Sequence, residues 1–446
     1  MTFKNKATRI RLADFSSAPM RAFHMSWFAF FICFFGWFGL APLMPVIRQE
    51  LHLTKAQIGN LTIASVAITV IVRALIGFLC DRMGPRRAYT WLLILGSLPV
   101  MGVGLAHDYR TFLLFRLAIG AIGASFVITQ YHTSVMFAPN IVGTANAASA
   151  GWGNLGGGVT QMVMPLLFAG FVSLGASKWL GWRMAMFVPG VIMLATGIAY
   201  YFLTQDTADG DFKAMRARGE MTAASAAKGA FAAACRDPRV WALFVIYAAC
   251  FGMELTIDNI AALYFTDNFH LGLTAAGFVA GSFGMMNIFA RALGGIVSDR
   301  CHKSRGLRGR VLLLGGTICC EGFALMLFSQ MRWLPLAIAT MMLTGLFIKM
   351  SNGATYAVVP FVNRKALGAV AGIVGAGGNM GSVLAGFLFK GSIPWTKALL
   401  VLGVIVTVIS LCSVVIRFSE AEEDSAEKEI AARLSVDMAL AGAMGD

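Results

Sequence analysis

The sequence predicts an all-α integral membrane protein whose twelve transmembrane helices form two pseudo-symmetric six-helix halves. Of its 446 residues, 58% are hydrophobic and 13% are charged, whereas soluble domains carry about 25% charged residues. The mean hydropathy of +0.72 is too high for a single soluble core, so lipid must solvate much of the surface. The net charge of +14 comes from basic residues in short segments between apolar stretches. It therefore indicates membrane topology, and no nucleic-acid partner is expected.

Twelve apolar stretches are long enough to cross a hydrocarbon core about 30 Å thick, which needs about 20 helical residues. The segment 1–24 is basic and precedes the first stretch, which is too long for a removable signal peptide and lacks its cleavage site. The polar segment 205–238 separates the halves 25–204 and 239–418, and an acidic tail, 419–446, follows. The predicted helices lie near 25–46, 58–80, 88–106, 111–137, 141–170, 180–204, 240–264, 274–297, 311–330, 333–355, 366–389 and 395–418.

The distribution of lysine and arginine predicts that both termini and the 205–238 linker lie in the cytoplasm. If the sides alternate from a cytoplasmic N-terminus, 24 of the 36 basic residues fall on the cytoplasmic side and eight on the other, as the positive-inside rule requires. We therefore expect a multi-pass protein of the inner (plasma) membrane. The eight cysteines have no paired spacing and the six histidines no ligand-like neighbours, so we expect no disulfide frame, metal site or cofactor.

Two matched motifs indicate that the halves repeat each other. In the second and eighth predicted helices, an arginine precedes an Asp-Arg pair by eight residues, with a glycine halfway between. The fifth and eleventh predicted helices carry Gly-Asn-x-Gly at corresponding places. Parallel six-helix repeats joined by a linker are typical of transporters that bind substrate near the midplane, between the halves. The matched residues are Arg73, Gly77, Asp81, Arg82, Gly153 and Asn154 in the first half, and Arg291, Gly295, Asp299, Arg300, Gly378 and Asn379 in the second.

Arg73 and Arg291 are expected to lie close to the membrane midplane. Eight helical residues span about 12 Å, while half of the hydrocarbon core is about 15 Å thick. A charged side chain at that depth is costly and suggests function, although each arginine could instead pair with a buried carboxylate. The four embedded cations outnumber the three embedded acids, so at least one cation lacks such a partner and we favour an anion site. The cations are Arg73, Arg116, Arg291 and Lys349, and the acids are Glu254, Asp258 and Glu321.

The donor geometry of two arginines favours a small planar anion. A guanidinium group is a planar fork that stays charged, and a trigonal oxyanion can accept two parallel hydrogen bonds from it. Nitrate and nitrite have this shape and are weakly hydrated. A phosphate ester or a dicarboxylate would usually call for more donors.

The glycine-rich runs allow two interpretations. Small residues four apart let helix backbones pack closely, and Gly153/Gly157 and Gly377/Gly381 fit that pattern. The missing side chains of Gly153 and Gly378 would also leave room for a substrate. Packing alone does not ask for asparagine, so Asn154 and Asn379 are also expected to offer their amides to a ligand.

The residues Gly77-xxx-Asp81-Arg82 and Gly295-xxx-Asp299-Arg300 resemble the cytoplasmic loop motif of the major facilitator superfamily, where it acts as a charge clasp at one gate. Four further segments make the chain similar to the nitrate/nitrite porter family of that superfamily. These segments resemble those of plant and fungal high-affinity nitrate transporters, and of their bacterial proton-coupled relatives, more than those of the exchanger type. The segments are 41–48 with 53–55, 130–131 with 151–158, 251–259 and 375–381.

This resemblance implies the major facilitator fold and roles for several residues. It implies that Arg73 and Arg291 grip nitrate, that Phe126 lines the site, and that Tyr247 and Phe251 sandwich the anion. The chain departs from the exchanger pattern because acidic and basic residues interrupt its membrane helices, which argues against pure anion exchange. We take Glu254 as the candidate proton carrier, with Asp258, Arg116 and Lys349 as neighbours that tune it.

The sequence therefore predicts a monomeric carrier, embedded in the lipid bilayer, whose ligands are nitrate, nitrite and protons. Proton-coupled nitrate uptake by alternating access is the favoured mode. Nitrate/nitrite antiport and nitrite export would use the same anion site and remain alternatives. A non-transporting anion sensor is a further alternative, although no signalling domain is recognisable. An enzyme is least expected, because we find no nucleophile–base pair, metal cluster or nucleotide loop.

Overall fold

The computed structural model describes residues 5–138, 141–219, 230–363 and 367–424. Helices dominate this part of the chain, and it contains only two isolated β-bridges and no strand. The first half contains α1 (Ala18–Phe38), α2 (Met44–Glu50), α3 (Lys55–Met83), α4 (Pro85–Gly102), η1 (Val103–Leu105), α5 (Tyr109–Gly120), η2 (Ala121–Ala124), α6 (Ser125–Met136), α7 (Val142–Ser173) and α8 (Lys178–Leu203). The second half contains α11 (Pro238–Phe269), α12 (Leu273–Met285), η3 (Met286–Ile288), α13 (Ala290–Gln330), α14 (Leu334–Val362), α15 (Leu367–Lys390), α16 (Trp395–Ile409) and η5 (Ser410–Val415).

The described part of the chain crosses the bilayer twelve times. It contains 11 apolar helical stretches long enough to do so, and one of these, Leu273–Gln330, has 58 residues. At 1.5 Å per residue that stretch measures about 87 Å, nearly three times the thickness of a hydrocarbon core. It is broken at Arg305 and at Gly306, whose φ of 59° lies in the left-handed region. The chain therefore turns there and crosses twice, which confirms the predicted fold class.

The first predicted helix, 25–46, is wrong at both ends. Helix α1 begins at Ala18, where Pro19 occupies the first turn, and it ends at Phe38. The chain then turns before α2 begins at Met44, with Pro45 in its first turn. Proline cannot continue a helix because it lacks an N–H donor and its ring clashes with the preceding turn. The apolar stretch therefore extends beyond the end of α1, although the helix does not.

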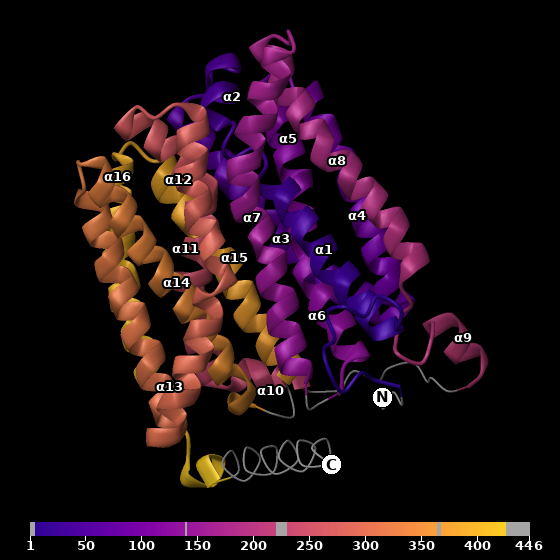
Figure 1. Ribbon diagram of the computed structural model, residues 1–446. Helices are drawn as coiled ribbons and strands as arrows, with labels where there is room; N and C mark the ends of the chain where they lie inside the picture. The colour runs from indigo at the N-terminus through magenta and orange to yellow at the C-terminus, as the bar shows by residue number, and fades with distance from the viewer. Residues whose placement is uncertain (1–4, 139–140, 220–229, 364–366, 425–446) are drawn as a thin grey trace.

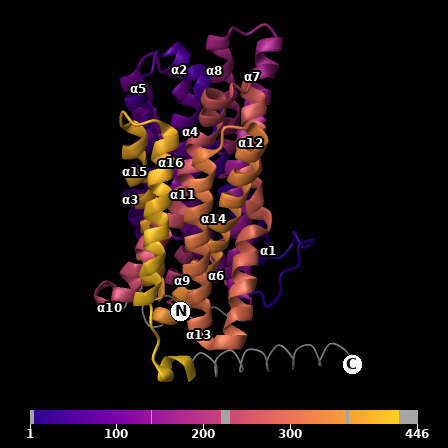
Figure 2. The same ribbon diagram turned by 90° about the vertical axis from the view of Figure 1, so that its left-hand side faces the viewer.

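The two halves lie side by side, with their helices running along one common direction (Figures 1 and 2). Within each half the glycine-rich helix packs on the first helix of that half: α7 on α1, and α15 on α11. The halves meet mainly where α3 packs on α15 and where α7 packs on α12. The glycine-rich helices therefore contribute both to the cores of the halves and to the contact between them.

The contact between α3 and α15 is tight at one end and open at the other. A Cβ on Gly59 would overlap the backbone of Lys390. Gly77 and Gly372 lie about five helical turns further along α3 and α15, on the same faces as Gly59 and Lys390. A Cβ at either of these two glycines would meet no described atom within 4 Å. The two helices therefore diverge toward the end of the bundle opposite to α2.

The contact between α7 and the segment α12–α13 has the same asymmetry. A Cβ on Gly277 would overlap the carbonyl oxygen of Gln161. Gly143 lies five turns from Gln161 on the same face of α7, and Gly295 follows Gly277 in the next helix, α13. A Cβ at either of these two glycines would meet no described atom within 4 Å. The halves are thus closed at the end that holds α2 and separated at the opposite end.

An ion pair reinforces the closed end. Arg48 of α2 donates two hydrogen bonds to the Asp267 carboxylate of α11, at 2.5 and 2.6 Å. Lys55, at the start of α3, also donates to the carbonyl of Ile393 in the second half. Both contacts join one half to the other.

The segment between the halves lies at the open end (Figure 1) and contains α9 (Phe212–Ala217) and α10 (Ala230–Arg236). The first described residues reach the same end, where Lys6 donates to the carbonyl of Ser134 near the end of α6. The tail is held there too, because Glu422 pairs at 2.9 Å with Arg239 of α11. The first and the last described residues therefore lie on one side of the bundle. Most of the predicted acidic tail, 425–446, lies outside the described residues.

Candidate anion-binding site

Arg73, in the middle of α3, joins the two halves through its guanidinium group. It donates to the carbonyl of Gly375 of α15 at 3.3 Å and to the carbonyl of Gly123 of η2 at 3.4 Å. Both bonds are long. The guanidinium carbon lies 5.6 Å from the centre of the Phe126 ring, a cation–π distance. No carboxylate in the described part of the chain forms an ion pair with Arg73.

Arg291, the repeat partner of Arg73, lies in a different electrostatic environment. Its guanidinium carbon lies 5.7 Å from the centre of the Phe251 ring, which matches the arrangement of Arg73 and Phe126. However, it also donates to the Glu254 carboxylate at 3.1 Å. In both arginines the Nε atom is buried without a hydrogen-bond partner, so each retains a free donor.

Glu254 is 2% exposed and accepts hydrogen bonds from four side chains. Asn287 and Lys349 donate to Oε1 at 2.8 and 2.9 Å. Asn352 and Arg291 donate to Oε2 at 2.6 and 3.1 Å. An ionised carboxylate offers about four acceptor positions, so this one is fully satisfied and neutralises part of the charge of two cations.

Arg116 is buried and bridges the two halves without a carboxylate partner. It donates to the carbonyl of Trp37 at 2.9 Å and to the side-chain oxygen of Asn259 of α11 at 2.6 Å. The expectation that at least one embedded cation lacks a carboxylate is confirmed for the described residues, since neither Arg73 nor Arg116 has one. Asp258 and Glu321 likewise form no ion pair there.

An aromatic cluster lies beside the two arginines. The rings of Tyr247 and Phe251 stack with centres 5.2 Å apart, and Tyr356 meets Tyr247 edge-on at 5.2 Å. The phenol groups of both tyrosines are within electrostatic range of Arg73 and Arg291. Because Tyr247 and Phe251 touch each other, no anion fits between those two rings. They form a single wall, so a sandwich would need a further ring such as Phe126.

The glycines of the Gly-Asn pairs serve packing. A Cβ on Gly153 would overlap the ring of Phe30 in α1, and a Cβ on Gly378 would overlap the ring of Phe251 in α11. The contacts correspond between the halves, which confirms the close-packing interpretation at these positions. They also show that Phe30 and Phe251 are equivalent residues of the repeat.

The asparagines of these pairs are buried and keep hydrogen-bonding capacity. Asn379 donates to the carbonyl of Gly375 at 3.5 Å, and its own side-chain oxygen has no partner. That carbonyl is the one that receives Arg73, so Arg73 lies next to the second glycine-rich motif. Asn154 is 4% exposed and makes no hydrogen bond through its side chain with the described residues.

The predicted clasp residues lie at the open end of the bundle. Asp299 pairs with Arg310 at 2.7 Å across the break in α13, while Arg300 is exposed. In the first half, the carbonyl of Arg82 accepts a hydrogen bond from Arg216 at 2.7 Å. The side chain of Asp81 lies outside the described part, so its predicted role stays a prediction.

Asp206, at the start of the linker, organises the corresponding loop of the first half. Its carboxylate accepts hydrogen bonds from the backbone N–H groups of Arg86 and Phe212, both at 3.0 Å. Burial raises the pKa of Asp206, partly offset by these hydrogen bonds. Arg86 also pairs with Asp211 at 3.1 Å, so the linker is fastened to the first half.

Several polar residues of this region were missed by the sequence reasoning. Two of them lie at helical spacing from a residue that was singled out: on α14, Asn352 follows Lys349 by three residues and Tyr356 follows it by seven. This helical spacing was a usable signal. The missed residues are Asn259, Asn287, Asn352 and Tyr356.

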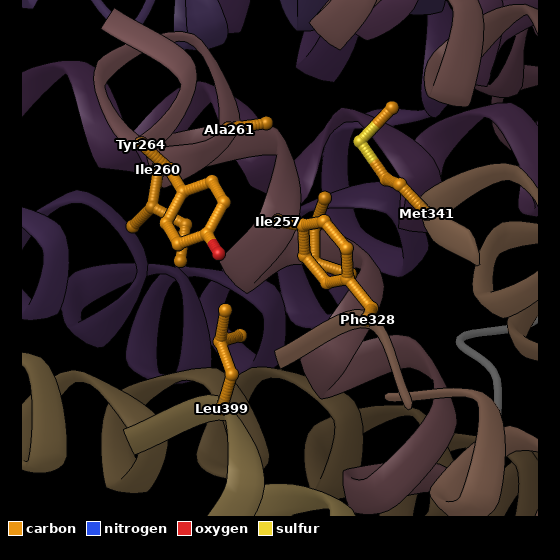
Figure 3. A pocket seen from close by; sticks show the side chains of 7 residues that line it. All are labelled: Ile257, Ile260, Ala261, Tyr264, Phe328, Met341 and Leu399. Carbon is orange, nitrogen blue, oxygen red and sulfur yellow. The ribbon is translucent and has the colours of Figure 1, made fainter. Parts of the chain in front are cut away.

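An enclosed cavity lies inside the second half (Figure 3). It measures about 10 Å³ and is lined mainly by apolar side chains from α11, α13, α14 and α16. It has room for at most one water molecule, so it is not the substrate site. In the described residues no three His, Cys, Asp or Glu side chains gather as metal ligands. The lining residues are Ile257, Ile260, Ala261, Tyr264, Phe328, Met341 and Leu399.

Comparison with known proteins identifies close relatives. The profile of the Major Facilitator Superfamily matches residues 26–361 and 259–440. The chain is 43% identical over 397 residues to "High affinity nitrate transporter 2.5" of Arabidopsis thaliana, covering 87% of this chain and 78% of the relative. It is 36% identical to "Nitrate transporter 2.1" of Chlamydomonas reinhardtii, covering 89% and 73%. It is 29% identical to "Nitrate/nitrite transporter NrtP" of Nostoc punctiforme, covering 82% and 85%.

Solved structures of other transporters share the fold. An inward-facing bacterial homologue of the human lysosomal transporter Spinster superimposes with a TM-score of 0.70 at 15% identity, covering 90% of this chain and 99% of that one. The nucleoside transporter NupG superimposes with a TM-score of 0.65 at 15% identity, covering 90% and 100%. At these identities the likeness concerns the fold alone.

Proposed function

Because the chain belongs to the major facilitator superfamily and, within it, to the nitrate/nitrite porter family, we propose that it is a secondary transporter of nitrate that also accepts nitrite. One observation carries this proposal: Arg73 is a membrane-embedded cation at the contact between the halves, without a described carboxylate partner. Such a charge is costly in a bilayer. A bound anion removes that cost.

The surroundings of Arg73 suit a small planar anion. Arg73 and Arg291 each lie against an aromatic ring and keep a free Nε donor. The amide nitrogen of Asn379 donates one long hydrogen bond, to the carbonyl of Gly375. Because an amide nitrogen carries two donor hydrogens, it can also donate to a ligand. Two guanidinium forks and the amides of Asn154 and Asn379 can donate to the oxygens of nitrate in several directions. These are the substrate-binding roles that we assign.

The unequal closure of the bundle supports alternating access. The halves touch at Gly59 and Gly277, whereas a Cβ at Gly77 or Gly295 would meet no described atom within 4 Å. If the halves rock about the substrate site, the open contacts close while the tight contacts part. With both termini in the cytoplasm, the arrangement described here faces inward.

Nitrate uptake against a negative-inside potential needs a driving ion, because each charge costs about 2.3 kcal/mol per 100 mV. We propose proton symport: one proton per nitrate makes entry electroneutral, so that the pH gradient drives it, and a second proton would make it electrogenic. The candidate coupling group consists of two acids of α11 and two cations that hydrogen-bond to side chains of α11: Glu254, Asp258, Arg116 and Lys349. Acidic groups in this position give protons a binding place that anion exchange does not require.

Purified protein in proteoliposomes tests the proposal. We expect nitrate to accumulate when an inward proton gradient is imposed, with or without nitrite inside. Accumulation only when nitrite is inside would show antiport instead of symport. Binding of nitrate without any counterflow would show a sensor, and the absence of both would refute an anion carrier. Labelling of cysteines placed in the 205–238 linker tests the orientation, which is wrong if that linker is reached from outside the cell.

A further inference from the structure

Two carboxyl groups one helical turn apart on α11 have opposite surroundings. Glu254 accepts four hydrogen bonds, two of them from cations. The carboxyl of Asp258 makes no hydrogen bond or ion pair with the described residues, and its Oδ1 atom is buried without a partner. Asp258 is 6% exposed. An ionised carboxylate in that state is costly, whereas a neutral carboxylic acid is far less so.

We propose that Asp258 is the group that binds and releases the transported proton, whereas Glu254 remains an ionised counter-ion. The proposal rests on the function proposed above and narrows its coupling group to one residue. Protonating Glu254 would strip Arg291 and Lys349 of their shared partner. Protonating Asp258 breaks no contact.

Asp258 lies where the halves meet. Its Oδ2 atom is 3.7 Å from the position that a Cβ on Gly157 of α7 would occupy. Its backbone carbonyl accepts a hydrogen bond from Gln161 of α7 at 2.6 Å. The next residue, Asn259, accepts from Arg116 of α5. A rocking motion of one half against the other therefore changes the surroundings of Asp258 directly, as a proton carrier requires.

The charged groups around Asp258 are few. Its own helix contributes Glu254, one turn away, and α14 contributes Lys349, both within electrostatic range. Arg291 of α13 reaches this region through Glu254, and Arg116 of α5 reaches it through Asn259. Of the other helices at the contact between the halves, α7 and α12 contain no charged residue and α15 contains only Lys390, at its far end. The embedded cation of α3 is Arg73. Among the described residues, none of these cations forms an ion pair with Asp258.

Electrostatics then links the proton to the anion. A proton from the solvent adds to the Asp258 carboxylate and gives a neutral acid, which removes one negative charge beside Glu254 and Lys349. Glu254 is also the partner of Arg291, so the charge balance around this arginine changes. Nitrate then meets a more positive site and binds more tightly, and bound nitrate equally favours the proton, because coupling between two sites is reciprocal. After the halves rock, nitrate leaves and the proton returns to water on the other side.

Nitrate binding to the purified full-length protein tests this inference. Titration calorimetry in buffers of different ionisation enthalpy counts the protons taken up with nitrate. For the wild type we expect proton uptake and an affinity about tenfold lower at alkaline than at acidic pH. For Asp258→Asn we expect no coupled proton uptake and an affinity that no longer depends on pH, close to the acidic wild-type value. In proteoliposomes the variant should lose proton-driven accumulation.

The matched control is Glu321→Gln, which alters another fully buried carboxyl of the same half and should retain coupled proton uptake. If Asp258→Asn does not fold, Asp258→Ala tests the same loss of a titrating group. Wild-type binding with proton uptake that persists in the Asp258 variant would overturn this inference but leave nitrate transport intact. Wild-type nitrate binding without any proton uptake would also overturn it. A wild type that neither binds nor carries nitrate would refute the proposed function itself.

Discussion

Replacing each intramembrane arginine by lysine separates the two roles that the structure gives them. Arg73→Lys keeps the charge but removes the planar fork, because lysine is a compact, strongly hydrated point charge. In the protein Arg73 makes only two long hydrogen bonds to carbonyls, at 3.3 and 3.4 Å, so little of its donor capacity is used internally. We expect the substitution to weaken nitrate binding severely while leaving the fold intact.

The magnitude follows from the donors that are lost. A hydrogen bond to a charged group contributes about 1.5–3 kcal/mol. Losing one of the two hydrogen bonds that a guanidinium group donates to the anion therefore lowers the affinity about 10- to 100-fold. Arg291→Lys should lower affinity by a similar factor. Since Arg291 also donates to the buried Glu254 carboxylate, that variant should in addition lower the thermal unfolding midpoint, which Arg73→Lys should not.

The assay is nitrate titration and thermal unfolding of both purified variants, with Arg110→Lys, an exposed position on α5, as the control. Near-normal nitrate affinity in Arg73→Lys would refute the reasoning, because it would mean that charge alone is enough. Equal destabilisation of both variants would contradict the different roles of the two arginines.

Three further predictions follow from the same contacts. Asn379→Ala should lower nitrate affinity at least tenfold through one lost charge-assisted hydrogen bond, and normal affinity in a folded variant would leave it a packing role. Gly158→Ala, whose Cβ would press on the α12 backbone, should slow transport strongly, whereas Gly170→Ala, on the same helix but in open space, should not. Glu254→Gln leaves two buried cations unpaired and should destabilise the protein by about 3–5 kcal/mol. Adding Lys349→Met should restore part of that loss in thermal unfolding, and no restoration would contradict the charge balance.

Spacing and composition predicted much of this molecule because the bilayer imposes simple rules. Apolar length fixes the number of crossings, and repeated motifs identified the arginines and the Gly-Asn pairs. The prediction failed where apolarity and helix formation diverge. The stretch from 39 to 43 is apolar but turns. The gap predicted between the helices 274–297 and 311–330, in contrast, does contain the break at Arg305–Gly306.

The partners of the site residues could not be predicted from spacing alone. An asparagine such as Asn352 or Asn287 is unremarkable until the neighbouring helices turn it toward Glu254. The rotation of a helix about its own axis decides which side chains face its neighbours. Many weak packing contacts set this rotation, such as that between the ring of Phe30 and Gly153, and no short motif encodes it. The charged residues of the site could therefore be identified from the sequence, but their partners could not.

The repeat misled in one respect, because it suggested two equivalent arginines. Phe30 and Phe251 occupy equivalent places under the glycine-rich helices, and the residue three positions further on is Cys33 in the first half and Glu254 in the second. The first half thus has no acid where the second has its counter-ion. Arg73 therefore keeps its charge for a ligand, while Arg291 is partly neutralised and held in place. Under the function proposed above, an anion held by both Arg73 and Arg291 joins the halves only while it is bound, which is the condition that an alternating carrier must meet.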